Sequence, residues 1–182
     1  GGAGGRGRGR GEWQAKSAKL RTTMETSDSG WVGCGGLWGL WVRGKLRAKK
    51  LERLRQKGSE GVREWAIKLR CENSKPSEAA RAEFARMAHE DKSPLVRLYL
   101  ASAMQRLLLK QRVPVLAHLL AHTEDKDDQN LPLMYWYATE PVVAADRVSA
   151  VKLLTACPIP KVRHCITLRM ATRRAPGTRA TV

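Results

Sequence analysis

The sequence predicts an all-α protein: a short α-solenoid of helical hairpins with disordered basic N- and C-terminal ends. Three observations lead to this prediction. Apolar residues recur at steps of three and four between about residues 37 and 171, which is the period of an amphipathic helix. Alternating β-branched segments bounded by turn residues, the pattern of strands, are missing. A Val-Arg pair near the start of a helical segment recurs at about 34 residues, a spacing typical of helical repeats.

Composition divides the chain into three parts. Residues 1–36 begin with the low-complexity run GGAGGRGRGRG, which cannot form a core, so we expect a disordered Gly/Arg-rich and polar leader. Such a run is either an Arg-Gly tail that binds RNA or an incidental basic leader. Residues 37–171 carry the predicted repeats. Residues 172–182 are basic and without a hydrophobic pattern, and we expect them to be disordered as well.

The first predicted helices are recognised by their apolar faces. The apolar run 30–42 contains five glycines and is shorter than the ~20 residues of a membrane span, so a buried helix or a mispredicted segment is preferred to a membrane span. Residues 48–57 place two leucines on one face. Residues 61–72 place Val62 and two further apolar residues at helical steps, and a helix over 76–90 is expected to carry its proline in the first turn.

The later helices are recognised by their start signals. Ser93 is placed as an N-cap ahead of Pro94, and Asp146 is placed as a cap in the same way. Prolines are expected in the first turns of three further helices, at Pro114, Pro132 and Pro160. The acidic segment EDKDDQN, residues 124–130, reads as a loop between two of these helices.

The repeat is visible in the spacing of the valines. Val62 and Val96 are separated by 34 residues, and Val96 and Val162 by 66, which is twice 33. The midpoint falls at the segment NLPLMYWY, so that segment is expected to carry the intermediate copy with Val-Arg replaced. Two helices per period of this length indicate a solenoid, in which neighbouring hairpins cover each other's apolar faces.

The helix start at residue 91 resembles the HEAT repeat. In the HEAT pattern an Asp precedes an Arg by six positions, with Pro between them and Val just before the Arg, and Asp91, Pro94, Val96 and Arg97 match it. This predicts an Asp-Arg ladder along the stack, to which Val62–Arg63 and Val162–Arg163 also belong. The other copies depart from the pattern, with a lysine at position 57 and a cysteine at position 157.

Longer stretches resemble the HEAT-repeat region of the PVC-type membrane-bound dehydrogenases. They are REWAIKLRCENSKPS, SPLVRLYLASAMQRL, LLAHTEDKDDQNLPLMYWYATEPVVAAD and IPKVRHCITLRMA, within about residues 37–171. The family implies a propeller-type sugar dehydrogenase domain, a HEAT-repeat region and a c-type cytochrome domain. Neither propeller blades nor a Cys-x-x-Cys-His haem motif occurs in this sequence, so the haem c would belong to a domain outside it. The resemblance implies a fragment that keeps the scaffold and lacks the chemistry, in a periplasmic or membrane-associated setting, although no signal peptide is visible.

Catalytic, cofactor-binding and metal-binding residues are assigned nowhere. His118 and His122 stand one helical turn apart beside the acidic loop with Asp125, Asp127 and Asp128, but the Glu of the helical zinc motif is missing. Surface imidazoles above a solvated loop are therefore preferred to a divalent-metal site, and contact of this loop with a partner stays open. The run 134–137, MYWY, is expected to lie mainly in the core with one or two residues facing outward.

Net charge separates the two functions that the sequence allows. The chain carries +17 in all, but residues 1–60 hold +9 of this and residues 61–171 only +5. A non-catalytic scaffold that binds protein domains or partner proteins is preferred. The alternative is a free-standing basic helical-repeat protein that binds nucleic acid through its cationic ends.

Overall fold

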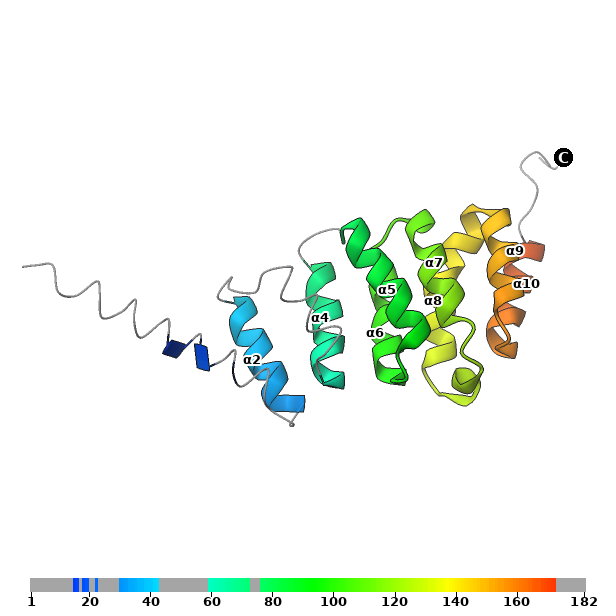
Figure 1. The fold of residues 1–182 in the computed structure, drawn as a ribbon. Helices are drawn as coiled ribbons and strands as arrows, with labels where there is room; N and C mark the ends of the chain where they lie inside the picture. The colour runs from blue at the N-terminus through cyan, green and yellow to red at the C-terminus, as the bar shows by residue number, and fades with distance from the viewer. Residues whose placement is uncertain are drawn as a thin grey trace, which may run out of the picture. The chain divides into compact units, whose positions relative to one another are not determined.

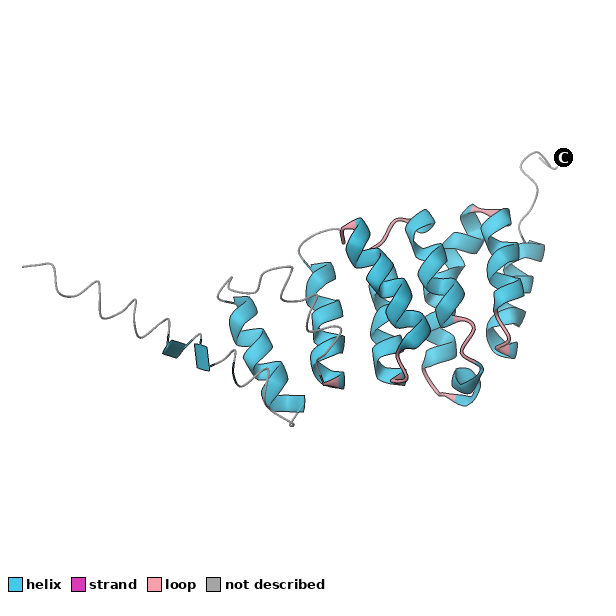
Figure 2. Ribbon diagram, in the orientation of Figure 1, coloured by secondary structure: helices cyan, strands magenta, loops and turns pink. Residues whose placement is uncertain are grey.

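The computed structural model describes residues 15–16, 18–19, 22, 30–42, 59–72 and 76–172, with side chains from residue 35 onward in the first long helix. Within these ranges all regular structure is helical and no strand occurs (Figure 2). The predicted all-α fold is therefore confirmed. The predicted helix over 48–57, most of the leader and the basic tail beyond Thr172 lie outside the described residues.

The described helices fall into two units, residues 1–74 and 75–182. In the first unit, α2 (Gly30–Val42) packs against α4 (Glu60–Glu72). Leu37 and Leu40 of α2 are buried in one cluster with Val62 of α4. The helix predicted for the run 30–42 is present and begins at Gly30, so the predicted end of the leader at residue 36 lies too late. Glycines obscure the helical period of this segment, but burial of its two leucines stabilises the helix all the same.

The second unit consists of six α-helices and one 3-10 helix in its described part. They are α5 (Glu78–Glu90), α6 (Pro94–Met104), α7 (Leu109–Leu119), η1 (Thr123–Asp127), α8 (Leu131–Ala145), α9 (Arg147–Ala156) and α10 (Pro160–Thr172). Consecutive helices pair as the hairpins α5/α6, α7/α8 and α9/α10. The first helices of the hairpins pack in the series α5, α7, α9, and the second helices in the series α6, α8, α10 (Figure 1). The three hairpins therefore stack in chain order.

The starts of these helices follow their local signals with two exceptions. The Ser93 hydroxyl accepts a hydrogen bond from the Val96 amide, and Asp146 caps α9 in the same way. Pro94, Pro132 and Pro160 lie in first turns as predicted. Pro76, however, precedes the cap of α5, and Pro114 lies inside α7, which begins at Leu109. The helix extends past the proline because residues on both sides of it, from position 112 to 119, are buried on one face.

The same apolar spacing recurs in four helices and identifies the copy in which Val-Arg is replaced. Val62, Val96, Leu131 and Val162 are all buried, and in each helix the residue four positions later is buried too. The intervals between these four residues are 34, 35 and 31. Leu131 therefore takes the place of valine, and Pro132 the place of arginine, in the intermediate copy.

Candidate functional site

Arginine occupies the fourth position of five of the described helices. They are Arg63 in α4, Arg81 in α5, Arg97 in α6, Arg112 in α7 and Arg163 in α10. A cation so close to a helix N-terminus opposes the helix dipole. The position must therefore be stabilised by something outside the helix's own turns.

For four of the five, Arg81, Arg97, Arg112 and Arg163, main-chain carbonyl groups just before the helix supply that stabilisation. Arg97 Nη1 donates to the Asp91 carbonyl at 3.1 Å, and Arg163 Nη1 donates to the Cys157 carbonyl at 2.9 Å. Arg81 does the same with the Pro76 carbonyl at 2.8 Å. Asp91 and Cys157 are the residues that end α5 and α9, so each arginine joins the two helices of its own hairpin.

Arg112 is bonded through all three nitrogens of its guanidinium. It donates to the carbonyls of Leu107 at 3.1 Å, Ala138 at 3.3 Å and Gln105 at 3.5 Å. Burial lowers the pKa of the Arg112 guanidinium, and its partners are main-chain carbonyls that carry no full charge. The bonds to three carbonyls compensate for the loss of water around the cation.

The predicted ladder residues are divided among three helix starts. Asp91, Pro94, Val96 and Arg97 meet at the joint between α5 and α6, Val162 and Arg163 lie at the start of α10, and Val62 and Arg63 lie at the start of α4. Asp91 meets Arg97 through its main-chain carbonyl, while its carboxylate accepts from the Ser93 amide at 3.0 Å. Because the acceptor for arginine is a main-chain group, cysteine at position 157 serves as well as aspartate at position 91.

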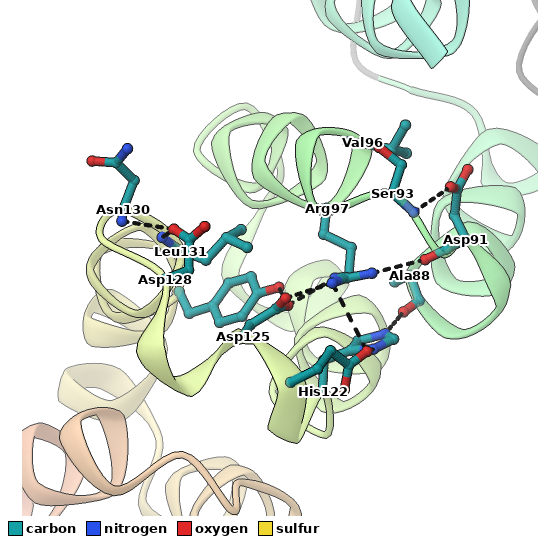
Figure 3. Close-up of polar contacts among 12 residues, drawn as sticks. Ala88, Asp91, Ser93, Val96, Arg97, His122, Asp125, Asp128, Asn130 and Leu131 are labelled. Atoms are coloured by element: carbon teal, nitrogen blue, oxygen red, sulfur yellow. Dashed lines mark hydrogen bonds and ion pairs between the residues drawn. The ribbon is translucent and has the colours of Figure 1, made fainter. Parts of the chain in front are cut away.

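The carboxylate that pairs with Arg97 comes from the next hairpin. Arg97 Nε and Nη2 donate to the two Asp125 oxygens at 2.7 and 2.5 Å, and the Tyr135 hydroxyl donates to Asp125 Oδ2 at 2.6 Å. The exposed fractions of Arg97, Asp125 and Tyr135 are 2%, 3% and 0%. Figure 3 shows the Arg97 side chain between Asp91, at the connection of α5 and α6, and the Asp125 carboxylate. One guanidinium therefore joins α5, α6 and η1.

Charges in this network are matched. Burial lowers the pKa of Arg97, but the hydrogen bonds and negative charge of Asp125 outweigh it, and the pKa is raised overall. Burial first, and then the bond to Asp125, raises the pKa of the Tyr135 hydroxyl. Tyr135 thus stays protonated as a donor, and both oxygens of the carboxylate are occupied. This network fixes the positions of the three side chains, and the Asp125 carboxylate within it is not available as a general base.

Histidines lie beside this network at the joint between α5 and α7. His122 Nδ1 lies 2.6 Å from Glu124 Oε1, and His122 Nε2 lies 2.7 Å from the Ala88 carbonyl (Figure 3). Through these two contacts His122 joins the 3-10 helix η1 to the end of α5. The His118 ring instead lies 5.0 Å from that of His89. Burial, together with the neighbouring histidines, lowers the pKa of His118.

The two histidines predicted to share a helical face therefore have different partners. Among the described residues, no group of three or more His, Cys, Asp or Glu side chains is arranged to hold a metal ion. Of the three acidic residues beside them, Asp125 is bound to Arg97, and Asp128 accepts from the amides of Asn130 and Leu131 at the start of α8. Asp128 thus shapes the loop.

Aromatic residues of α8 divide between core and surface, as predicted. Tyr135 is fully buried, Trp136 and Met134 are half-buried, and Tyr137 is 51% exposed. Leu168 of α10 is also 51% exposed. Tyr137 and Leu168 stand six residues after Leu131 and Val162, so they hold the same repeat position on two adjacent helices.

Sequence reasoning missed Asp125 as the partner of Arg97, and Arg81 and Arg112 as further members of the arginine series. Both missed arginines follow a helix start by three residues. A search for arginine at that position, without requiring valine before it, would have found them. Asp125 carries no such signal, because four acidic residues stand within positions 124–128.

Comparison with protein-family models, curated proteins and solved structures finds no match to this chain. Within the described residues, no helix is long and apolar enough to cross a membrane.

Proposed function

We propose that this chain is a non-catalytic helical-repeat scaffold that binds protein domains. In this role it resembles the HEAT-repeat region that links the propeller to the c-type cytochrome in PVC-type membrane-bound dehydrogenases. The observation that supports the proposal is that buried charged side chains bind other parts of the helical stack. Arg97, Arg112 and Asp125 are all bonded within or between hairpins, so the polar interior serves the stacking of helices.

Exposed apolar side chains give this scaffold a surface for partners. Leu133, Tyr137 and Leu168 are 40 to 51% exposed on α8 and α10. Aromatic and large aliphatic side chains dominate the binding energy of protein interfaces. Tyr137 and Leu168 occupy matching positions on neighbouring helices, and they therefore suit a partner that lies across the stack.

Direct binding tests the proposal. The purified full chain is immobilised, and the propeller domain and the cytochrome domain of a PVC-type dehydrogenase are passed over it separately. We expect at least one of them to bind, with a Tyr137→Ser variant binding at least about tenfold more weakly, as for the loss of an interface aromatic residue. Val148→Ser on α9, where the side chain is 65% exposed, is the matched control and should leave binding unchanged. Binding of neither domain would contradict the family-based form of the proposal.

Nucleic-acid binding is the alternative that the net charge of +17 supports. Its carriers, residues 1–14 and 173–182, lie outside the described residues. Fluorescence anisotropy with labelled duplex DNA and single-stranded RNA separates the two functions. Affinity that falls steeply with salt and is lost on removal of residues 1–30 would assign binding to the basic end. Affinity that survives removal of both basic ends, residues 1–30 and 173–182, would favour nucleic-acid binding by the helices over the scaffold function.

A further inference from the structure

We propose that the outer side of the last described hairpin is a docking surface for a helical hairpin of a partner protein that carries a carboxylate for Arg163. The inference rests on the proposed scaffold function and specifies the surface and the chemistry of its partner. Its basis is a position-by-position comparison of the three stacked hairpins.

Side chains of α6, α8 and α10 show which side of a hairpin faces its successor. Counting from Val96, Leu131 and Val162, the residues one, five and eight positions later are compared. In α6 they are Arg97, Ala101 and Met104, all buried. In α8 they are Pro132, Trp136 and Thr139, of which only Trp136 is half-exposed. In α10 they are Arg163, Thr167 and Met170, of which the first two are exposed and the third is half-buried. The side that is covered in α6 is thus uncovered in α10.

First helices of the hairpins show the same gradient. The core residues Phe84, Leu116 and Ala150 align α5, α7 and α9, and all three are fully buried. The residue one position later is half-buried in α5 and α7 and is the 46% exposed Val151 in α9. Four positions after the aligned core residues, Ala88 and Leu120 are buried whereas Leu154 is half-exposed. Three positions before the aligned core residues, Arg81 and Val113 are half-buried whereas Arg147 is exposed. We define the α9/α10 end surface by six residues: Arg147, Val151, Leu154, Arg163, Thr167 and Met170.

Interactions at the inner joints confirm which side this is. Arg97 binds Asp125, and the Ala88 carbonyl contacts His122, so both positions face the hairpin that follows. The end surface holds the equivalent positions of α9 and α10. It is therefore the same side of a hairpin that contacts the next hairpin at the two inner joints of this unit.

The chemistry of the missing partner follows from Arg163. At the inner joint, Arg97 uses Nη1 for the carbonyl six residues before it and uses Nε and Nη2 for the Asp125 carboxylate. Arg163 uses Nη1 for the Cys157 and Leu154 carbonyls, and its other edge contacts no carboxylate in the described part of the chain. A forked guanidinium edge matches a carboxylate with two parallel hydrogen bonds. An acidic residue at the end of a partner's first helix would fill the place that Asp125 fills on Arg97.

Charge argues for a separate protein rather than a second copy. The end surface contains two arginines and no acidic residue, and residues 173–182 contain three arginines and no Asp or Glu. The segment of this chain that fits such a surface is α7–η1–α8, but its Asp125 is already buried against Arg97. A chain with a net charge of +17 also repels its own copies.

The test supplies the missing hairpin in the same molecule. A copy of residues 107–145 is inserted into the full chain after Thr172, in the register that relates α6 to α10. Urea unfolding is measured for this extended chain, for its version with the copied Asp125→Asn, for its version with Arg163→Gln, and for the double variant. We expect the extension to shift the unfolding midpoint to higher urea. We also expect Arg163 and the copied aspartate to be coupled by about tenfold or more in the unfolding equilibrium constant, as for a charge-assisted bond in a covered site.

Three results would overturn the inference. An extension without a midpoint shift, or with a shift but no coupling between Arg163 and the copied aspartate, would show that the surface does not accept such a hairpin. Self-association of the unextended chain in sedimentation, abolished by Arg163→Glu, would make a second copy the occupant. The extension is intramolecular and does not depend on a dehydrogenase domain. It can therefore fail while the dehydrogenase-domain binding test succeeds, or succeed while that test fails, so the docking surface and the scaffold function are refuted separately.

Discussion

Replacing Asp125 by asparagine removes the only carboxylate that contacts both Arg97 and Tyr135 in the described structure, at nearly constant side-chain volume. The carboxylate accepts three hydrogen bonds of 2.5 to 2.7 Å, and its partners are at least 97% buried. Removing one partner of a buried ion pair costs about 3–5 kcal/mol, because the other charge is left uncompensated. The Glu124 carboxylate lies 3.8 Å from Arg97 Nη2 but is 60% exposed, so it offsets at most about 1 kcal/mol.

We therefore expect Asp125→Asn to lower the free energy of unfolding by about 3 kcal/mol, a large share of the ~5–15 kcal/mol typical of a domain. Urea unfolding followed by circular dichroism at 222 nm measures this. With the usual dependence on urea, the midpoint should fall by about 1–3 M.

Matched variants separate the ion pair from general effects of the loop. Asp127 lies in the same 3-10 helix and its side chain is 86% exposed, so Asp127→Asn should change stability by less than about 0.5 kcal/mol. The triple variant Arg97→Met, Asp125→Leu and Tyr135→Phe removes both charges together with the hydroxyl that would lose its acceptor, and it should lie within about 1 kcal/mol of the parent chain. The reasoning is refuted if Asp125→Asn costs no more than Asp127→Asn.

Three further changes test neighbouring groups. Tyr135→Phe removes the donor to Asp125 and should lower the free energy of unfolding by about 1–2 kcal/mol at pH 7. The pKa of Tyr135 is raised in the folded chain, so the tyrosine of the unfolded chain ionises first as the pH rises. Urea midpoints measured above about pH 10 should therefore fall more in the parent chain than in the variant. The pKa of His118 is lowered by burial and by two neighbouring histidines, so the unfolded histidine takes up a proton first; stability should fall as the pH drops below about 6.5, and His118→Gln should make urea midpoints between pH 7.5 and 5.5 less pH-dependent. Equal slopes in the two chains would exclude this role. Thr139 is fully buried and its hydroxyl has no hydrogen-bond partner in the described structure, so Thr139→Val should raise the melting temperature, by the equivalent of about 0.5–1.5 kcal/mol; a clear decrease would show that the hydroxyl is bonded.

Local signals in the sequence were sufficient for most of the described helices. Ser93 and Asp146 cap the helices expected of them, because a cap bonds to amides only two or three residues away. Burial of Val62, Val96 and Val162 followed from their spacing alone. The helix over residues 30–42 was also expected, and two buried leucines stabilise it. One start that depends on packing was missed: α7 begins five residues before Pro114, because the residues on one face of this helix are buried.

Partners of the site residues were harder to predict because they are remote or belong to the main chain. Asp125 lies 28 residues from Arg97, and nothing in its sequence context separates it from the other acids of the loop. The Asp91 side chain was expected to bind Arg97, yet the contact is made by the Asp91 carbonyl. A main-chain acceptor exists at every residue, so a pattern of side-chain types cannot reveal it.

Arg97 and Arg163 show why arginine suits this position better than lysine would. Each uses one terminal nitrogen to hold the end of the preceding helix, which needs only a carbonyl and therefore tolerates aspartate or cysteine there. The opposite edge of the planar guanidinium points to the next hairpin, where two donors in a fixed geometry select a carboxylate. A lysine ammonium is a single point of charge and cannot span both contacts. At Arg97 the joint within a hairpin and the joint to the next hairpin are thus coupled through one side chain, and the Asp125 carboxylate fixes the register of these two hairpins.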